Sequence, residues 1–403
     1  MNDSGELQKL RIAMVSLHTS PLDQPGRGDA GGLNVYVRQL ASALSRAGHH
    51  VEVFTRGEGS SDFLSPLIPV HYLPAGPPGP LVKEQLPQHL DEFGHALCKA
   101  TTDQFDVIHT HYWMSAEAAL SCRADFRIPI VHTMHTMGRV KLHEYPEARE
   151  LAERVDAEDN IVGLAARLTA NTPAERDELV RFYQAPLSKI DVIAPGVNLE
   201  IFHPDGNRAT WPLPEVPGAL KVLFAGRIQE FKGPQVLFNA LRIARTEHPE
   251  LPIQAVFIGD ISGQDHLNLP HLVERYGMHD DVALLPAQPP ERLADWFRAA
   301  DVVAVPSFSE SFGLVAMEAQ ACGTPVLAHA SGGLAHTVLD AQTGALLQDL
   351  DPHRWAIKLV ELARDGVPEA WSAQAAAHAR DFSWERTATN AVASYRRAIQ
   401  PTK

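Results

Sequence analysis

The segment DVVAVPSFSESFGLVAMEAQACGTPVLAHA, residues 301–330, contains in succession a strand, a helix and a second strand. Residues 301–307 and 324–330 are short apolar runs, and the stretch between them reads as a loop followed by a helix that begins near Gly313. Nearly continuous apolar strands separated by helices are typical of a parallel sheet covered on both faces. The segment therefore predicts an α/β fold.

The same alternation runs through the whole chain and begins again after residue 220. Together with the length of 403 residues, it predicts two doubly wound, Rossmann-like domains, residues 1–200 and 201–403, joined by a Pro/Gly-rich linker. The helix after residue 384 could pack on either domain. Ligands of open α/β sheets bind outside the carboxyl ends of the strands, so we expect the site in the cleft between the domains. The predicted strands are 10–18, 50–57, 105–111, 128–135 and 190–197 in the first domain, and 221–227, 253–260, 281–287, 301–307 and 324–330 in the second.

The charge balance argues against two classes of partner. Lys and Arg number 35 against 49 Asp and Glu, and the net charge of -14 disfavours nucleic acid and anionic membrane surfaces. Cys98, Cys122 and Cys322 have no metal-like spacing, so we expect reduced thiols in a cytoplasmic protein. The N-terminal apolar run is too short for a signal peptide, and no 18-residue apolar span occurs.

A glycine-rich loop follows the first predicted strand, in HTSPLDQPGRGDAGGLNVYVRQLASAL (18–44). Four glycines between residues 26 and 32 lead into an amphipathic helix, where main-chain N–H groups can approach an anion. The loop lacks the GxGxxG pattern, and no acidic residue ends the second strand, which argues against NAD. We expect a phosphate site here; the alternative is a plain strand-to-helix turn.

Two cations stand at the start of the second domain, in LFAGRIQEFKGPQVL (223–237). Arg227 ends a predicted strand, and Lys232 precedes a helix that should open at Gly233-Pro234. Two cations beside a helix N-terminus predict a diphosphate site.

Two carboxylates interrupt the apolar segment 301–330, although burying a charge is costly. Glu310 should lie in the cleft loop and Glu318 in the second turn of the helix, so one could hold a sugar and the other a ribose. The amides at the start of this helix would be free donors facing the same cleft. The alternative for Glu318 is a buried capping or salt-bridged role.

The spacing of these two glutamates within PSFSESFGLVAMEA resembles the signature of the retaining glycosyltransferases of family 4, which have the two-domain GT-B architecture. The resemblance runs over nearly the whole chain. HTSPLDQPGRGDAGGLNVYVRQL, THYWMSA, GRIQEFKGPQVL and RAADVVAVPSFSESFGLVAMEAQACGTPV are most similar to the members in mycothiol biosynthesis, which transfer N-acetylglucosamine from UDP-GlcNAc to D-inositol 3-phosphate.

The resemblance implies roles for individual residues, and position alone adds His135, one of several histidines at predicted strand ends. The expected catalytic residues are Arg227, Lys232, His135 and Glu310. The expected donor-binding residues are His18, Gln24, Pro25, Gly32, Arg227, Lys232, Gln288, Glu310, Phe312, Gly313, Leu314 and Glu318. The expected acceptor-binding residues are Asp29, Ala30, Gly31, Gly32, Leu33, Asn34, Lys83, Tyr112, Thr136 and Arg154.

The sequence departs from the family at two positions of the expected site. Gln288 stands where the family commonly has an arginine, and Arg27 replaces a small residue in the glycine-rich loop. The expected partners are a UDP-sugar donor and a phosphorylated polyol acceptor, with no nucleic acid or membrane, and a homodimer is left open. We expect no required cofactor and no metal bridging the diphosphate, while a peripheral Mg²⁺ held by carbonyls is compatible with the sequence.

Three alternatives stay open. Another family 4 transferase would use a different nucleotide sugar with a sugar phosphate or malate, since such acceptors occur in the family. A UDP-GlcNAc 2-epimerase shares the architecture but needs no basic second pocket, so Lys83 and Arg154 argue against it. A non-catalytic sugar-binding protein of the periplasmic kind would carry a signal peptide.

Overall fold

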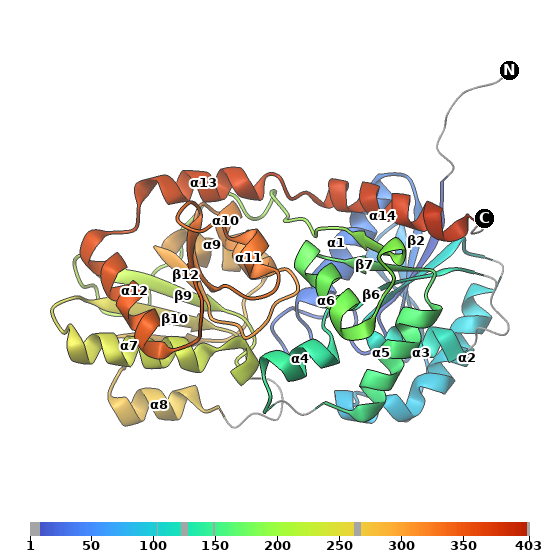
Figure 1. Ribbon diagram of the computed structural model, residues 1–403, viewed down its shortest axis with the longest axis horizontal. Helices are drawn as coiled ribbons and strands as arrows, with labels where there is room; N and C mark the ends of the chain where they lie inside the picture. The colour runs from blue at the N-terminus through green and yellow to red at the C-terminus, as the bar shows by residue number, and fades with distance from the viewer. Residues whose placement is uncertain (1–8, 103, 122–127, 148–149, 262–266, 401–403) are drawn as a thin grey trace, which may run out of the picture.

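The computed structural model describes residues 9–102, 104–121, 128–147, 150–261 and 267–400. Two α/β domains lie side by side along the long axis of the molecule, and the chain passes between them twice (Figure 1). Each domain is built on a largely parallel sheet with helices on both faces, as the sequence predicted. Cys122 lies outside the described residues.

The first domain holds an eight-stranded sheet of order β3-β4-β2-β1-β5-β6-β7-β8, in which only the edge strand β3 is antiparallel among the described pairs. Residues of β1 alternate between two apolar cores, with Ala13 and Val15 in one and Ile12 and Met14 in the other. Alternation arises because successive side chains of a strand point to opposite faces. The strands are β1 (Arg11–Val15), β2 (His50–Arg56), β3 (Asp62–Ser65), β4 (Ile68–Leu73), β5 (Val107–His111), β6 (Ile130–Thr133), β7 (Arg167–Ala170) and β8 (Ile190–Val192).

Helices cover both faces of this sheet. They are α1 (Gly32–Arg46), α2 (Leu90–Thr101), α3 (Trp113–Ser121), α4 (Gly138–Glu144), α5 (Ala152–Leu164) and α6 (Pro173–Tyr183), with the short 3-10 helices η1 (Lys83–Gln85), η2 (Pro87–His89) and η3 (Leu187–Lys189).

The second domain holds a six-stranded parallel sheet of order β11-β10-β9-β12-β13-β14. Its strands are β9 (Leu220–Ala225), β10 (Ile253–Ile258), β11 (Val282–Leu285), β12 (Val302–Val305), β13 (Val326–His329) and β14 (Gly344–Leu347). Its helices are η4 (Glu230–Lys232), α7 (Pro234–Glu247), α8 (Leu269–Tyr276), α9 (Pro290–Ala299), α10 (Leu314–Ala321), α11 (Leu334–Thr337), α12 (Pro352–Asp365) and α13 (Glu369–Ala379). As predicted, α7 opens after Gly233 and α10 opens after Gly313.

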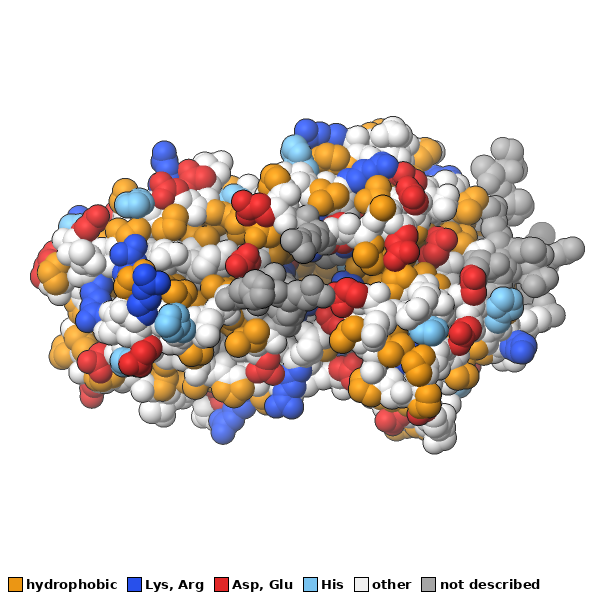
Figure 2. Space-filling model, turned by 90° about the horizontal axis from the view of Figure 1, so that it is seen from below, with side chains coloured by type: hydrophobic (Ala, Val, Ile, Leu, Met, Phe, Trp, Pro, Cys, Tyr) orange, Lys and Arg blue, Asp and Glu red, His pale blue; other side chains and the backbone are white. Residues whose placement is uncertain are grey.

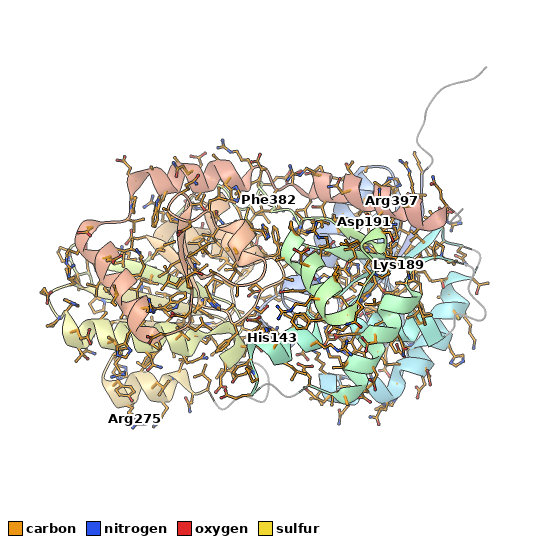
Figure 3. The ribbon with its side chains drawn as sticks, in the orientation of Figure 1. His143, Lys189, Asp191, Arg275, Phe382 and Arg397 are labelled. Carbon is orange, nitrogen blue, oxygen red and sulfur yellow. The ribbon has the colours of Figure 1, made fainter. Side chains whose placement is uncertain are left out.

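The last helix, α14 (Trp384–Ile399), returns to the first domain, so the range 201–403 predicted for the second domain includes an element that packs on the first. Trp384 and Tyr395 enter the core formed with α1 and β1. Arg397 forms an ion pair with Asp191 in the middle of β8, with Nη2 and Oδ1 2.8 Å apart (Figure 3). The two connections between the domains touch each other, since the N–H of Val197 donates to the carbonyl of Phe382 at 3.0 Å.

Acidic side chains lie on both halves of the face shown in Figure 2, in keeping with the net charge of -14. Among the described residues, none of the helices is both long and apolar enough to cross a lipid bilayer.

Candidate functional site

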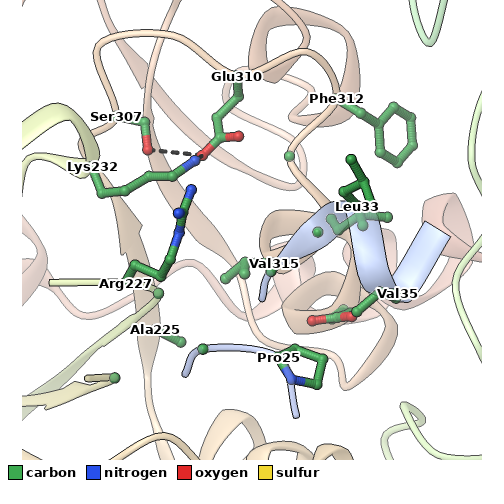
Figure 4. A pocket seen from close by; sticks show the side chains of 18 of the residues that line it. Pro25, Leu33, Val35, Ala225, Arg227, Lys232, Ser307, Glu310, Phe312 and Val315 are labelled. Carbon is green, nitrogen blue, oxygen red and sulfur yellow. Dashed lines mark hydrogen bonds and ion pairs between the residues drawn. The ribbon is translucent and has the colours of Figure 1, made fainter. Parts of the chain in front are cut away.

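A cavity of about 290 Å³ opens between the domains, at the carboxyl ends of both sheets (Figure 4). Its volume is close to the lower end of the range for small-molecule sites. It brings together most of the predicted residues: His18, Pro25, Asp29, Gly31, Gly32, Leu33, Lys83, Tyr112, His135, Thr136, Arg227, Lys232, Gln288, Glu310, Phe312, Gly313, Leu314 and Glu318. The predicted residues Gln24, Ala30, Asn34 and Arg154 do not line it.

Lys232 and Glu310 contact each other on the second-domain side of the cavity. Lys232 Nζ lies 2.5 Å from Glu310 Oε1, and the same oxygen accepts a hydrogen bond from Ser307 Oγ at 3.0 Å (Figure 4). Gly233 fixes the turn that follows Lys232, because its φ is +74° and a Cβ there would lie 1.9 Å from the carbonyl oxygen of Pro306. Arg227, just after β9, makes no ion pair among the described residues. Lys232 and Glu310 make no other ion pair among the described residues, so a ligand can redirect both side chains.

The start of α10 offers free main-chain donors to the same cavity. Within the described parts of the chain, the N–H groups of Phe312, Gly313 and Leu314 have no backbone acceptor. The unpaired N–H groups at a helix N-terminus carry partial positive charge, which favours an anion. This arrangement matches the predicted donors.

Glu318 lies on α10 at the wall of the cavity and is 8% exposed. Burial raises the pKa of its carboxyl to about 8. Glu318 makes no ion pair with any described residue, so the salt-bridged alternative is not what the structure shows. A buried carboxyl without a cation is costly, and it is available to a ligand hydroxyl.

The glycine-rich loop closes the cavity from the first domain. Asn34 holds the loop, because its Oδ1 accepts the N–H of Gly31 at 2.8 Å and its Nδ2 donates to Thr19 and Ser20. The amino end of α1 therefore points toward Arg227: a Cβ on Gly31 would lie 3.7 Å from Arg227 Nε. The side chain of Asn34 is engaged in the loop itself.

Tyr112 stands between two cations on the first-domain side. Lys83 Nζ lies 4.5 Å and Arg154 Cζ 5.1 Å from the centre of its ring, distances typical of cation–π contacts. Arg154 is buried behind Tyr112 and donates from Nη2 to Thr136 Oγ1 at 3.1 Å.

Two carboxylates already neutralise Arg154. Its Nη1 lies 2.7 Å from Glu150 Oε2, and its Nε lies 2.8 Å from Glu158 Oε1. The expectation that Lys83 and Arg154 make a basic second pocket therefore needs correction for Arg154. Lys83 lines the cavity and forms no ion pair among the described residues, so it supplies most of the positive charge on this side.

His135 follows β6 with a left-handed backbone, φ +60°. Its Nε2 lies 3.0 Å from His111 Nδ1, so one ring donates and the other accepts, and Tyr36 packs edge-on at 4.9 Å. Desolvation lowers the pKa of His135 to about 3. The imidazole is therefore neutral at physiological pH.

Two family models match the chain. The model described as Glycosyltransferase Family 4 matches residues 30–201, and the model described as Glycosyl transferases group 1 matches residues 208–378. The D-inositol 3-phosphate glycosyltransferase of Paenarthrobacter aurescens (strain TC1) is 46% identical over 400 residues, which cover 96% of this chain and 98% of that protein. The chain belongs to glycosyltransferase family 4.

Other relatives and solved structures agree with this assignment. The D-inositol 3-phosphate glycosyltransferase of Streptomyces avermitilis is 44% identical, over 97% of this chain and 88% of that protein. The sucrose-phosphate synthase of Thermosynechococcus elongatus superposes with a TM-score of 0.82 at 31% identity, over 96% of this chain and 98% of that one. Anabaena HepE in complex with UDP and glucose has a TM-score of 0.73 at 20% identity, over 95% and 98%, and shows the shared fold.

Sequence reasoning missed several residues at the cavity of this family 4 glycosyltransferase. Asn171 lines the cavity and lies 3.5 Å from Ser311 Oγ of the other domain, and its neighbour Thr172 donates to the carbonyl of Ser311 at 3.3 Å. Asn171 follows β7, which was not predicted, so its place at a strand end was hidden. Gly332 and Gly333, adjacent in the sequence, pack closely against the Glu310–Ser311 segment, because a Cβ on either would lie 2.4 Å from one of its carbonyl oxygens.

Within the described ranges, His, Cys, Asp and Glu side chains form no group of three that could hold a metal ion. The peripheral Mg²⁺ and the homodimer left open by the sequence stay predictions.

Proposed function

We propose that this chain transfers N-acetylglucosamine from UDP-GlcNAc to D-inositol 3-phosphate with retention of anomeric configuration. The names of relatives that match nearly end to end at 41 to 46% identity support the acceptor. The observation that carries the proposal is the cavity between the domains, which has cations and free main-chain donors on one wall and Lys83 beside Tyr112 on the other.

The donor is proposed to bind the second-domain wall. The diphosphate would be bound by Arg227, Lys232 and the amino end of α10. Glu318 would accept a hydrogen bond from a ribose hydroxyl. Glu310 now shares its oxygen with Lys232, so an arriving diphosphate would draw Lys232 away and leave Glu310 for a sugar hydroxyl. The titles of the HepE complexes name UDP and UDP-glucose as ligands of that protein, which fits a nucleotide-sugar site in this fold.

The transfer step needs no protein nucleophile in this proposal. The bond between the anomeric carbon and the phosphate oxygen breaks, a bond to an acceptor oxygen forms on the same face, and the acceptor proton passes to the departing diphosphate. Arg227 and Lys232 would stabilise the charge that develops on the diphosphate. Because the pKa of His135 is about 3, we assign it a hydrogen bond to the sugar and no proton transfer, which narrows the predicted catalytic role.

The acceptor is proposed to bind the first-domain wall. Lys83 would contact its phosphate, with hydroxyls of Tyr112 and Thr136 beside it and the glycine-rich loop above. Arg154 would act through Tyr112 and Thr136, which it contacts, while its own charge is balanced. Rigid placement of the acceptor lowers the barrier to attack.

One assay tests donor and acceptor together: UDP release from UDP-GlcNAc with inositol phosphates, free inositol, sugar phosphates and malate. D-inositol 3-phosphate should be the best acceptor, and an α-linked product in the NMR spectrum would establish retention. Equal rates with free inositol would contradict the phosphate site, and a β-linked product would contradict retention. UDP-GlcNAc incubated alone should give no 2-epimer.

A sugar phosphate acceptor is the second candidate. The sucrose-phosphate synthase structure favours it, because it superposes at a TM-score of 0.82 with 31% identity. Faster turnover with a hexose phosphate than with D-inositol 3-phosphate would select this alternative.

A further inference from the structure

Three aromatic rings connect the two domains beside the cavity. Tyr145, directly after α4, lies 4.8 Å from Phe308 and 6.3 Å from Phe231 between ring centres, and Phe231 and Phe308 lie 6.2 Å apart. Tyr145 also donates from its hydroxyl to Glu230 Oε2 at 2.8 Å. We call Tyr145, Glu230, Phe231 and Phe308 the interdomain clasp. Figure 1 shows α4 between the domains, and Figure 3 places its His143 at their junction.

The second-domain members of the clasp adjoin two proposed donor residues. Phe231 directly precedes Lys232, and Phe308 stands two residues before Glu310. The N–H of Phe308 donates to the carbonyl of Phe231 at 3.0 Å, which joins the two loops. The clasp is therefore joined to the backbone beside both Lys232 and Glu310.

The other end of α4 is anchored behind the acceptor wall. The N–H of Gly138, the first residue of α4, donates to Glu158 Oε2 at 2.9 Å, and Glu158 also binds Arg154. From the middle of α4, Lys141 Nζ lies 2.5 Å from Glu150, the second partner of Arg154. The helix is thus fixed to the group that holds Tyr112 and Thr136.

Lys141 links the anchor to the clasp, because its Nζ also lies 5.7 Å from the centre of the Phe231 ring. The contacts form a continuous path from Arg154 through Glu150, Lys141 and Phe231 to Lys232. A rigid helix in contact with both walls can transmit a small shift from one to the other.

We propose that Tyr145 is a positioning residue: it holds Lys232 and Glu310 in place from the acceptor domain, so that acceptor binding and donor binding are coupled. This inference rests on the proposed function, because it takes Lys232 and Glu310 to be donor contacts. A displacement of about 1 Å at such groups can lower a rate about a hundredfold.

Two substitutions separate the parts of the clasp. Tyr145→Phe keeps the ring and removes the hydroxyl, and should lower kcat about threefold, whereas Tyr145→Ala removes both and should lower kcat about 10- to 100-fold. UDP binding, measured by calorimetry, should weaken about threefold to tenfold in Tyr145→Ala. Tyr276→Phe is the matched control, because Tyr276 is an exposed tyrosine at the end of α8 and does not line the cavity. It should leave both quantities unchanged.

The decisive measurement is the coupling between acceptor binding and UDP binding, because a residue with only a structural role would leave this coupling unchanged. The Kd for UDP is measured without and with saturating D-inositol 3-phosphate. The Kd without the acceptor divided by the Kd with it should be above one in the wild type and should approach one in Tyr145→Ala. A wild-type ratio with wild-type kcat in Tyr145→Ala would overturn the proposal. If thermal unfolding shows that this variant does not fold, Tyr145→Phe decides, and an unchanged kcat and ratio would overturn it.

The wild-type protein separates this inference from the proposed function. If the wild type does not turn over UDP-GlcNAc with D-inositol 3-phosphate, the proposed function fails. The clasp is then still judged by the affinity for UDP alone, and equal affinities in the wild type and Tyr145→Ala would overturn the positioning role.

Discussion

The two walls of the cleft treat their charged groups differently. Behind the first-domain wall, Arg154 is 4% exposed and binds Glu150, Glu158 and Thr136 at once. On the second-domain wall, Lys232 binds only Glu310 among its described ion-pair partners, and the two side chains are 22% and 20% exposed. One wall is assembled before any ligand arrives, and the other pairs groups that a ligand would separate.

The difference predicts where each substitution should act. Removing one partner of a buried ion pair leaves an uncompensated charge and costs about 3 to 5 kcal/mol of stability. The Lys232–Glu310 pair is partly exposed, so its contribution should lie closer to the value of about 0 to 1 kcal/mol for surface pairs. Breaking the buried network of Arg154 should therefore lower stability, whereas removing Lys232 from its pair with Glu310 should lower activity.

Arg154→Met should have the largest effect. Glu158 is fully buried, and without Arg154 it keeps only neutral donors, so we expect a loss of about 3 to 5 kcal/mol in the free energy of unfolding. Denaturant unfolding measures it. Arg176→Met is the control, since its ion pair with Asp177 is exposed. A loss of less than about 1 kcal/mol in Arg154→Met would show that the ion pairs of Arg154 do not stabilise the folded protein as a buried network should.

Lys232→Ala should cost catalysis and leave stability nearly unchanged. Loss of a charge-assisted contact to the diphosphate should remove about 2 to 4 kcal/mol of transition-state stabilisation, or a factor of about 30 to 1,000 in kcat. Initial rates and a thermal melt should be measured on the same preparation. A wild-type rate would remove Lys232 from the donor site, and a large drop in melting temperature would erase the contrast between the walls.

Lys83→Ala sharpens the comparison within the acceptor wall. Lys83 carries the unbalanced charge there, so we expect kcat/KM for D-inositol 3-phosphate to fall about 10- to 30-fold, or about 1.4 to 2 kcal/mol. The affinity for UDP should not change. If the variant loses affinity for UDP but not for the acceptor, the two walls have been assigned the wrong way round.

Glu318→Gln should have an effect that depends on pH. The pKa of Glu318 is raised from 4.5 to about 8, so the folded state binds the proton more tightly than the unfolded state. Stability from this proton is complete below pH 4.5 and is lost as the pH rises to about 8. The melting temperature of Glu318→Gln relative to the wild type should therefore rise by several degrees between pH 5 and 8. A constant difference would contradict the buried, protonated state.

The sequence predicted the fold class because most strands are nearly continuous apolar runs between helices. It missed β7 and β14, which have four residues each, and the β3–β4 hairpin at the edge of the sheet. In β7, Arg167 and Thr169 alternate with apolar residues and interrupt the run. Pairing with β6 and β8 forms this strand, and that information lies elsewhere in the chain.

For the site, local motifs located most of the cavity residues that are proposed to bind the donor, because a loop and the helix after it are adjacent in sequence. The balance of charge around Arg154 could not be predicted, since it depends on which carboxylates α5 and its neighbours bring together. Contacts between Tyr145 and the loops of the second domain span more than 80 residues, and neither segment shows a pattern that indicates the other.

The return of α14 to the first domain has a consequence for synthesis on the ribosome. One core of that domain needs Trp384, Val392 and Tyr395, yet its other members, such as Ile12 and Leu40, are made almost a whole chain earlier. At about 5 to 20 residues per second, that apolar face waits on the order of 10 to 40 s while the second domain emerges. The nascent chain must therefore complete its second domain before its first, with an uncovered surface that chaperones would recognise.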